Sequence, residues 1–185
     1  VCDPSNFTQS IVNTSKQIVQ TSSTAQNMVN NFKEVQKVYN QGKQYYDALK
    51  AVNGLVKDAK KVQRTILMVG EISDIYVHSF QKMLSDPNYS IEELNAIANG
   101  YTRLLEQSND VLTELKGVVN ISTLSLSDKD RIDVVNSCYD AMTDYRNLVR
   151  YYTNKNIGVS YLRAKKKGET ARVNALYGNP SDRYW

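Results

Sequence analysis

The residues with the greatest potential for chemistry are the single histidine, His78, and two cysteines, Cys2 and Cys138. A cysteine nucleophile needs an adjacent base, and nothing in the sequence places either cysteine beside His78 or adds an orienting carboxylate. A disulfide between Cys2 and Cys138 would fit an oxidising compartment, and two buried free thiols would fit the sequence equally well. These residues predict no catalytic centre, and the disulfide stays an open alternative.

Motifs that hold metals or phosphates are missing from the sequence. It contains no C-x-x-C pair, no H-E-x-x-H helix, no D-x-D-x-D-G loop and no G-x-x-x-x-G-K loop. Carboxylate pairs occur at Glu92-Glu93 and at Asp128 with Asp130, but both stand at predicted helix starts, where the helix dipole stabilises negative charge. We therefore expect no metal, no cofactor and no enzymatic activity.

A basic cluster near the C-terminus could contact a polyanion. Together with neighbouring tyrosines it could bind a nucleic-acid strand through phosphate contacts and stacking. The cluster consists of Arg163, Lys165, Lys166 and Lys167. The competing interpretation is a solvated helix end, because lysines complement the negative pole of the helix dipole. The net charge of only +4 does not demand a polyanion partner, so we favour the solvated end.

Tyrosine is abundant, with 13 residues in the chain. Tyrosine combines apolar area with a polar tip and is enriched at protein interfaces. Two aromatic clusters are candidate partner-docking surfaces, one around Gly42 and one near the C-terminus. They consist of Tyr39, Tyr45 and Tyr46, and of Tyr177, Tyr184 and Trp185.

Helices must position these residues, because glycine (8) and proline (3) are both scarce. Apolar residues recur at alternating spacings of four and three from Phe7 to Leu49, as in a coiled coil. This pattern predicts one amphipathic helix over residues 4–50, with a stripe of roughly 65 Å. The sequence leaves open whether the stripe folds back on its own chain or pairs with a second copy.

Further helices follow the Asn53-Gly54 turn signal. The second ends at the Ser85–Asn88 segment and is apolar on more than one side between residues 65 and 77, which predicts a central position. Ser90 to Glu93 forms a capping box that opens the third helix.

A fourth helix should begin at Ser127 and loosen at Gly158 and Gly168, before a short helix over residues 169–177. We thus predict an all-α, elongated antiparallel helical bundle with one very long N-terminal helix. The single domain would comprise bundle helices over about 55–154 and a short C-terminal helix and tail over 155–185.

No run approaches the roughly eighteen apolar residues needed to span a bilayer, so we expect no transmembrane segment in this chain. The sequence begins at Val1, not at methionine, which fits a processed protein whose leader has been removed.

Several stretches resemble known transfer proteins. The opening Asp3-Pro4-Ser5-Asn6-Phe7 and the polar, amphipathic segment after it resemble mature TrbJ-like proteins, the minor-pilin component of conjugative type IV secretion systems. The segments 31–40, 148–157 and 175–180 resemble TraI-type transfer proteins of conjugative transposons in Bacteroidetes, and this narrower resemblance covers nearly the whole chain.

The resemblance implies an exported protein, periplasmic or at the cell surface, that assembles with other proteins of the conjugation apparatus. It offers no catalytic residues to carry over, and the wider family's small appendage has no counterpart that we can place here. We expect a non-catalytic interaction subunit that binds transfer-apparatus proteins and can self-associate. The alternative is a nucleic-acid-binding accessory factor that uses the Arg163–Lys167 cluster.

Overall fold

The computed structural model describes residues 59–119 and 128–179 and, before them, Lys37, Asn40, Gln41, Lys43 and Gln44. The two continuous ranges form four helices and no strand: α3 (Ala59–Leu84), α4 (Ile91–Val119), α5 (Asp128–Lys167) and α6 (Thr170–Tyr177). The prediction of an all-α fold is confirmed. The predicted helix over 4–50 lies outside the described residues, apart from those five isolated positions, which are helical.

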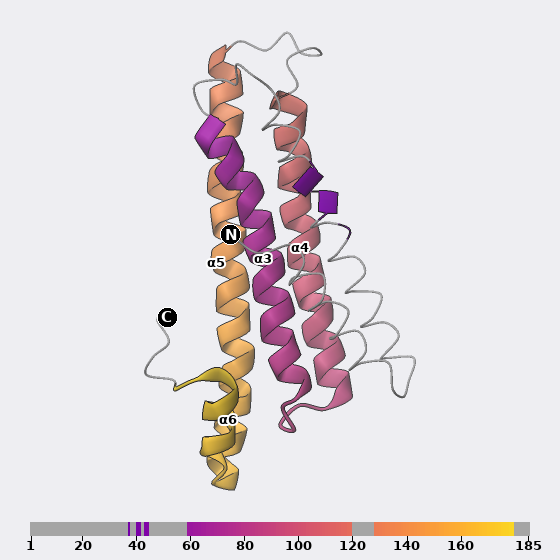
Figure 1. The fold of residues 1–185 in the computed structure, drawn as a ribbon, viewed down its shortest axis with the longest axis vertical. Coiled ribbons are helices and arrows are strands. Elements are labelled where there is room, and N and C mark those ends of the chain that lie inside the picture. Colours follow the sequence, from indigo (N-terminus) through magenta and orange to yellow (C-terminus); the bar gives the residue numbers. More distant parts are fainter. Residues whose placement is uncertain (1–36, 38–39, 42, 45–58, 120–127, 180–185) are drawn as a thin grey trace.

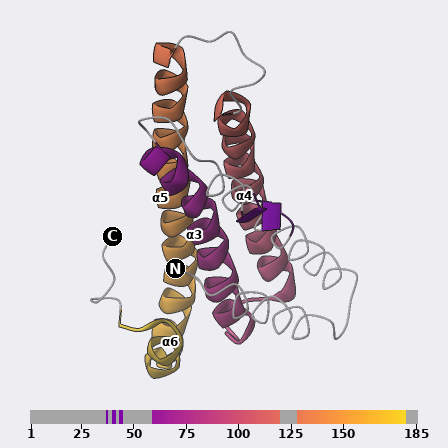
Figure 2. The same ribbon diagram turned by 45° about the horizontal axis from the view of Figure 1, so that its top comes forward.

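Helices α3, α4 and α5 lie side by side along the long axis of the molecule, and α6 lies beside the C-terminal end of α5 (Figures 1 and 2). The short turn between α3 and α4 reverses the chain, so these two helices are antiparallel. Helix α5 has 40 residues, which corresponds to about 60 Å at 1.5 Å per residue. The described part of the chain is therefore an elongated antiparallel bundle, as predicted.

The middle of α3 is buried on several sides, as its wide apolar pattern predicts. Both α4 and α5 pack against it, and this double cover removes most of its side chains from water. Leu67 is the exception and remains 42% exposed. The buried side chains of this stretch are Thr65, Ile66, Met68, Val69, Ile72, Ser73, Tyr76 and Val77.

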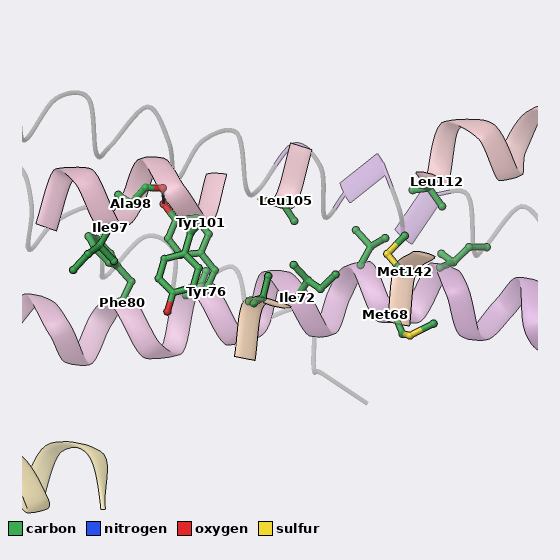
Figure 3. Packing of buried hydrophobic residues seen from close by; sticks show 14 of the residues in the cluster. Met68, Ile72, Tyr76, Phe80, Ile97, Ala98, Tyr101, Leu105, Leu112 and Met142 are labelled. Carbon is green, nitrogen blue, oxygen red and sulfur yellow. Dashed lines mark hydrogen bonds between the residues drawn. The ribbon is translucent and has the colours of Figure 1, made fainter. Parts of the chain in front are cut away.

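Three tyrosines, one from each long helix, form the aromatic centre of the core. The rings of Tyr76 (α3) and Tyr101 (α4) stack at 4.6 Å (Figure 3), and Tyr152 (α5) meets Tyr101 edge-on at 4.9 Å. Each hydroxyl has a partner: Tyr76 and Tyr152 donate to backbone carbonyls of α4, and Tyr101 bonds to Thr153 at 2.5 Å. Burial raises the pKa of Tyr76 and of Tyr101, so both phenols stay neutral.

The predicted capping box at the start of α4 is confirmed. The backbone N–H of Glu93 donates to Oγ of Ser90 at 3.2 Å, and the backbone N–H of Ser90 donates to Oε2 of Glu93 at 2.9 Å. Two N–H groups that would otherwise lack a helical acceptor are satisfied in this way. The cap fixes the direction in which α4 leaves the turn.

Helix α5 corrects one predicted boundary. It runs through Gly158 without interruption to Lys167, so the division between bundle and C-terminal segment at about residue 154 was wrong. Ile157 and Ser160 are both buried on either side of Gly158, and this packing outweighs the cost of about 1 kcal/mol for glycine inside a helix. The helix ends at Gly168, which has a φ of 71°. Helix α6 follows where the short helix was predicted.

Candidate interaction surface at the C-terminal end of the bundle

Asp86 is the centre of a buried polar network at the end of the bundle where α3 turns into α4. Its side chain is nearly inaccessible to solvent, with the residue 3% exposed. One carboxylate oxygen accepts hydrogen bonds from Ser160 of α5 at 2.5 Å and from Tyr177 of α6 at 2.8 Å. The other accepts the backbone N–H of Asn88 at 2.9 Å, which closes the turn. One buried carboxylate thus joins the turn, α5 and α6.

Asn88 extends the same network along α5. Its side-chain amide donates to Oγ of Ser160 at 3.2 Å, and its backbone carbonyl accepts from Arg163 at 2.6 Å. Lys167 donates to Oδ1 of Asn88 at 3.4 Å. The turn is therefore attached to the last two turns of α5 by side-chain hydrogen bonds.

Arg163 forms a two-pronged ion pair with Glu93. The guanidinium nitrogens lie 2.6 and 2.8 Å from the two carboxylate oxygens. This pairing, together with the hydrogen bond from Ser90, lowers the pKa of Glu93 to about 2 and raises the pKa of Arg163. Because both side chains are about 40% exposed, the pair is screened by water and salt and contributes little stability on its own.

Two tyrosines at this end act as hydrogen-bond donors. Tyr89 donates to the backbone carbonyl of Asn156 at 2.5 Å, and Tyr177 donates to Asp86. Burial is the main cause of a raised pKa for both phenols, and nearby Asp86 raises both further. They remain protonated at neutral pH, so their role is to hold the network together.

Helix α6 packs against α5. Val173 is fully buried, and Tyr161 of α5 donates to Oδ1 of Asn174 at 2.6 Å. Gly178 closes the helix with a φ of 81° while its N–H donates to the carbonyl of Asn174. These contacts and the Asp86–Tyr177 bond give the C-terminal end one defined orientation on the bundle.

The predicted polyanion cluster is divided by these contacts. Arg163 is occupied by Glu93 and by the backbone carbonyl of Asn88, and Lys167 reaches the Asn88 side chain. Lys165 and Lys166 are exposed to solvent. Lys167 is exposed as well, so the three lysines are accessible to solvent while Arg163 is engaged in an ion pair.

Among the predicted docking tyrosines, Tyr177 is described and lies in the Asp86 network, partly buried. It anchors the C-terminal end instead of projecting from it. The other predicted docking residues lie outside the described residues: Tyr39, Tyr45, Tyr46, Tyr184 and Trp185.

The candidate residues for chemistry are not gathered at this end. His78 is exposed on α3 and pairs with Oδ1 of Asp74 at 2.8 Å. Cys138 is buried on α5, and as a thiol it has a pKa that is raised to about 11, mainly by burial. Cys2 lies outside the described residues, so the disulfide stays a prediction.

Two absences concern the described ranges alone. Among residues 59–119 and 128–179, no group of three or more His, Cys, Asp or Glu side chains is arranged to hold a metal ion. No helix in the part of the chain that the structure describes is both long and apolar enough to cross a bilayer.

Sequence reasoning did not find the roles of Asp86 and Ser160. The sequence marks Asp86 only as part of a helix-ending segment, and Ser160 carries no signal in its local sequence. The two residues are brought together by the packing of α5 against the turn, 74 positions apart in the chain. A buried partner at that separation cannot be read from spacing along one helix.

Comparisons with known proteins give one partial likeness. Residues 1–32 match a family described as a domain of unknown function, DUF4141. No curated protein and no solved structure matches the chain. The matched segment precedes the described bundle, so the family likeness and the structure concern different parts of the protein.

Proposed function

We propose that this chain is a non-catalytic, exported interaction subunit of a conjugative type IV secretion apparatus, with a minor-pilin-like role. The proposal is supported by the resemblance of its opening to TrbJ-like proteins and of segments 31–40, 148–157 and 175–180 to TraI-type transfer proteins. The subunit would reside in the periplasm or at the cell surface and would bind other transfer proteins.

The observation that carries the interaction role is the fixed orientation of α6. Tyr177 donates to the buried carboxylate of Asp86, which also accepts from Ser160. A buried polar network is costly unless every member finds a partner, and a satisfied one favours a single arrangement of the helices. A rigid bundle end suits a protein that binds a partner beside α6, and we propose that Tyr184 and Trp185, which lie outside the described residues, take part in that binding. Such rigidity lowers the entropic cost of binding.

The same network supports a non-catalytic role. Asp86 is the most buried carboxylate at this end, and three donors already engage it. A general base must offer a lone pair to a substrate proton, and a carboxylate bonded in this way serves structure instead. His78, the other candidate base, is solvent-exposed and lies on α3 beside Asp74.

The alternative proposal is a nucleic-acid-binding accessory factor. It would depend on Lys165 and Lys166, because Arg163 is engaged by Glu93 and Lys167 reaches Asn88. Phosphate contacts produce a steep loss of affinity with salt. This alternative would be favoured by a gel shift that is strong in low salt. The double substitution Lys165→Gln with Lys166→Gln should then abolish the shift. No retardation in low salt would remove the alternative.

The experiment that tests the main proposal is an in-frame deletion of the gene in a donor strain. We expect transfer frequency to fall by about tenfold or more, since the loss of an essential contact is rarely compensated. The wild-type gene supplied in trans should restore transfer. In the complemented strain, added protease should digest the protein once the outer membrane is permeabilised. Normal transfer without the gene, or a protein protected in the cytoplasm, would contradict the proposal.

A further inference from the structure

The outer face of the second half of α5 exposes large apolar side chains. Leu162 is 65% exposed and Tyr151 is 58% exposed, values that are high for residues of their size in a packed bundle. Leu148 and Val159 are 45% and 41% exposed. On a helix with 100° per residue these four positions fall within a stripe about 80° wide, and they extend over about 21 Å. We call these four residues the α5 stripe.

The stripe lies opposite a second apolar face of the same helix. Val149, Ile157 and Ala164 are buried against the rest of the described bundle. Helix α5 stands at the edge of the bundle, with α3 and α4 on the same side of it (Figure 1). A helix that is apolar on two sides needs a second neighbour, and the α5 stripe faces away from the first.

The charges along the length of the stripe are basic, and the exposed carboxylate of Asp144 lies one helical turn before Leu148. The charged residues between positions 145 and 167 are all lysine or arginine. Five aspartates precede them in residues 128–144. Lys155, Lys165 and Lys166 are exposed on this face or beside it. Lys155 lies within the stripe, with its ammonium 5.3 Å from the centre of the Tyr151 ring. The occupant of this face must therefore tolerate apolar side chains and carry negative charge.

Two occupants from this protein itself fit poorly. A second copy of α5, paired through the same stripe, would bring two wholly basic segments together, which is unfavourable. The N-terminal segment 1–50 carries five lysines and three acidic residues, so its net charge is positive like that of the stripe. Either occupant would bury the apolar side chains of the stripe, but its own basic side chains would repel those of α5.

An anionic lipid surface satisfies both requirements. Leucine, valine and tyrosine side chains enter the boundary between headgroups and acyl chains, and lysine stems extend along it with the ammonium group at the phosphates. Tyrosine is suited to this boundary because its ring is apolar and its hydroxyl is polar. A lipid surface also accommodates the convex outer face of a helix without a matching groove.

We propose that the second half of α5 binds the surface of an anionic phospholipid bilayer through the α5 stripe and the lysines around it. The helix would lie parallel to the surface, with Leu148, Tyr151, Val159 and Leu162 inserted. This inference goes beyond the proposed role in conjugation and does not depend on it, because a purified bundle should bind lipid in the absence of any transfer protein.

The test is flotation of the purified full chain with vesicles. One set contains about 30% phosphatidylglycerol in phosphatidylcholine, and the other contains phosphatidylcholine alone. We expect binding to the anionic vesicles at least about tenfold stronger than to the neutral ones, and weaker at high salt. Failure to bind the anionic vesicles, or equal binding to both sets, would overturn the proposal.

Two variants separate the apolar and the ionic contributions. The first is a leucine double variant, Leu148→Ser with Leu162→Ser. The second is a lysine double variant, Lys155→Gln with Lys166→Gln. Each should weaken binding to the anionic vesicles by about tenfold. The matched control is Leu67→Ser, which removes a similarly exposed leucine from α3. It should bind as the wild type does. Circular dichroism should show unchanged helicity in all three, because every altered side chain is exposed.

Three further outcomes would overturn the lipid proposal in favour of another occupant. If the lysine variant loses binding and the leucine variant does not, the face is a simple polyanion contact. If light scattering shows that the wild type is a dimer and that the leucine double variant is a monomer, the occupant of the stripe is a second copy of the chain. If Leu67→Ser weakens binding as much as the stripe variant, the lipid-binding face is not the α5 stripe.

Discussion

Gly100 of α4 lies directly against the phenol of Tyr152 from α5. A β-carbon built on Gly100 would stand 2.6 Å from Cζ of that ring and closer still to its hydroxyl. The ring cannot move away freely, because its hydroxyl donates to the carbonyl of Ile97 at 3.1 Å and its edge meets Tyr101. The absence of a side chain at Gly100 thus permits the close approach of α4 and α5 beside the tyrosine centre.

Replacing Gly100 with alanine should destabilise the protein by about 1–3 kcal/mol, the usual cost of overpacking a core, partly offset by up to about 1 kcal/mol of helix propensity. Urea unfolding followed by circular dichroism measures the difference. Gly117→Ala is the matched control on the same helix, because nothing lies within 4 Å of its added β-carbon. It should be neutral or stabilising. Equal stability of the two variants would contradict the described packing.

Tyr177→Phe removes one of the two side-chain donors to Asp86. The lost hydrogen bond to a buried carboxylate should cost about 1–2 kcal/mol, and the cost should appear as local opening of α6. Hydrogen exchange should be faster at the amides of α6 and unchanged in the middle of α3. Tyr145→Phe serves as the control, since Tyr145 is a partly buried tyrosine on α5 that packs against the core and is not part of the Asp86 network. Unchanged exchange in α6 would mean that Tyr177 does not hold the helix.

Acid should weaken the ion pair between Glu93 and Arg163. The pKa of Glu93 is lowered from 4.5 to about 2 in the folded protein, so its contribution to stability is complete above about pH 4.5. That contribution is lost as the pH falls from 4.5 towards 2. A double-mutant cycle with Glu93→Gln and Arg163→Gln, measured by urea unfolding, should give a coupling energy at pH 7 that disappears near pH 2. A coupling that persists at low pH would exclude this ionisation as its source.

The Cys138 thiol should react slowly in the native protein. A pKa raised from 9.0 to about 11 lowers the thiolate fraction at pH 8 by about a hundredfold, and burial restricts access further. In a Cys2→Ser variant, a thiol reagent should modify Cys138 only after denaturant is added. Rapid modification of the folded variant would contradict the burial. The number of thiols titrated in the denatured, unreduced wild type also shows whether the predicted disulfide forms: two thiols mean that it is absent, and none means that it is present.

Local signals predicted the elements well. The capping box at Ser90 and Glu93 requires only residues three apart, and the structure forms both of its hydrogen bonds. The wide apolar pattern of residues 65–77 correctly predicted cover by more than one neighbouring helix, because a helix that is apolar on several sides must be covered on several sides. Both signals lie within a single helical turn or face.

Long-range pairing could not be predicted in the same way. The sequence predicts that the helix loosens at Gly158, but the burial of Ile157 and Ser160 against other helices holds α5 together there. The partner of Arg163 is Glu93, 70 positions away, so no spacing rule connects them. The basic cluster was therefore visible in the sequence, while the contact that divides it was not.

The central claim is that a rigid bundle presents its C-terminal end to a partner during DNA transfer. The most direct measurement is transfer frequency from a deletion donor that carries the Tyr184→Ala, Trp185→Ala double variant, compared with the same donor carrying Leu67→Ser. The account predicts a loss of about tenfold or more for the double variant, as for hot-spot aromatics, with unchanged urea unfolding. Wild-type transfer by the double variant would contradict it.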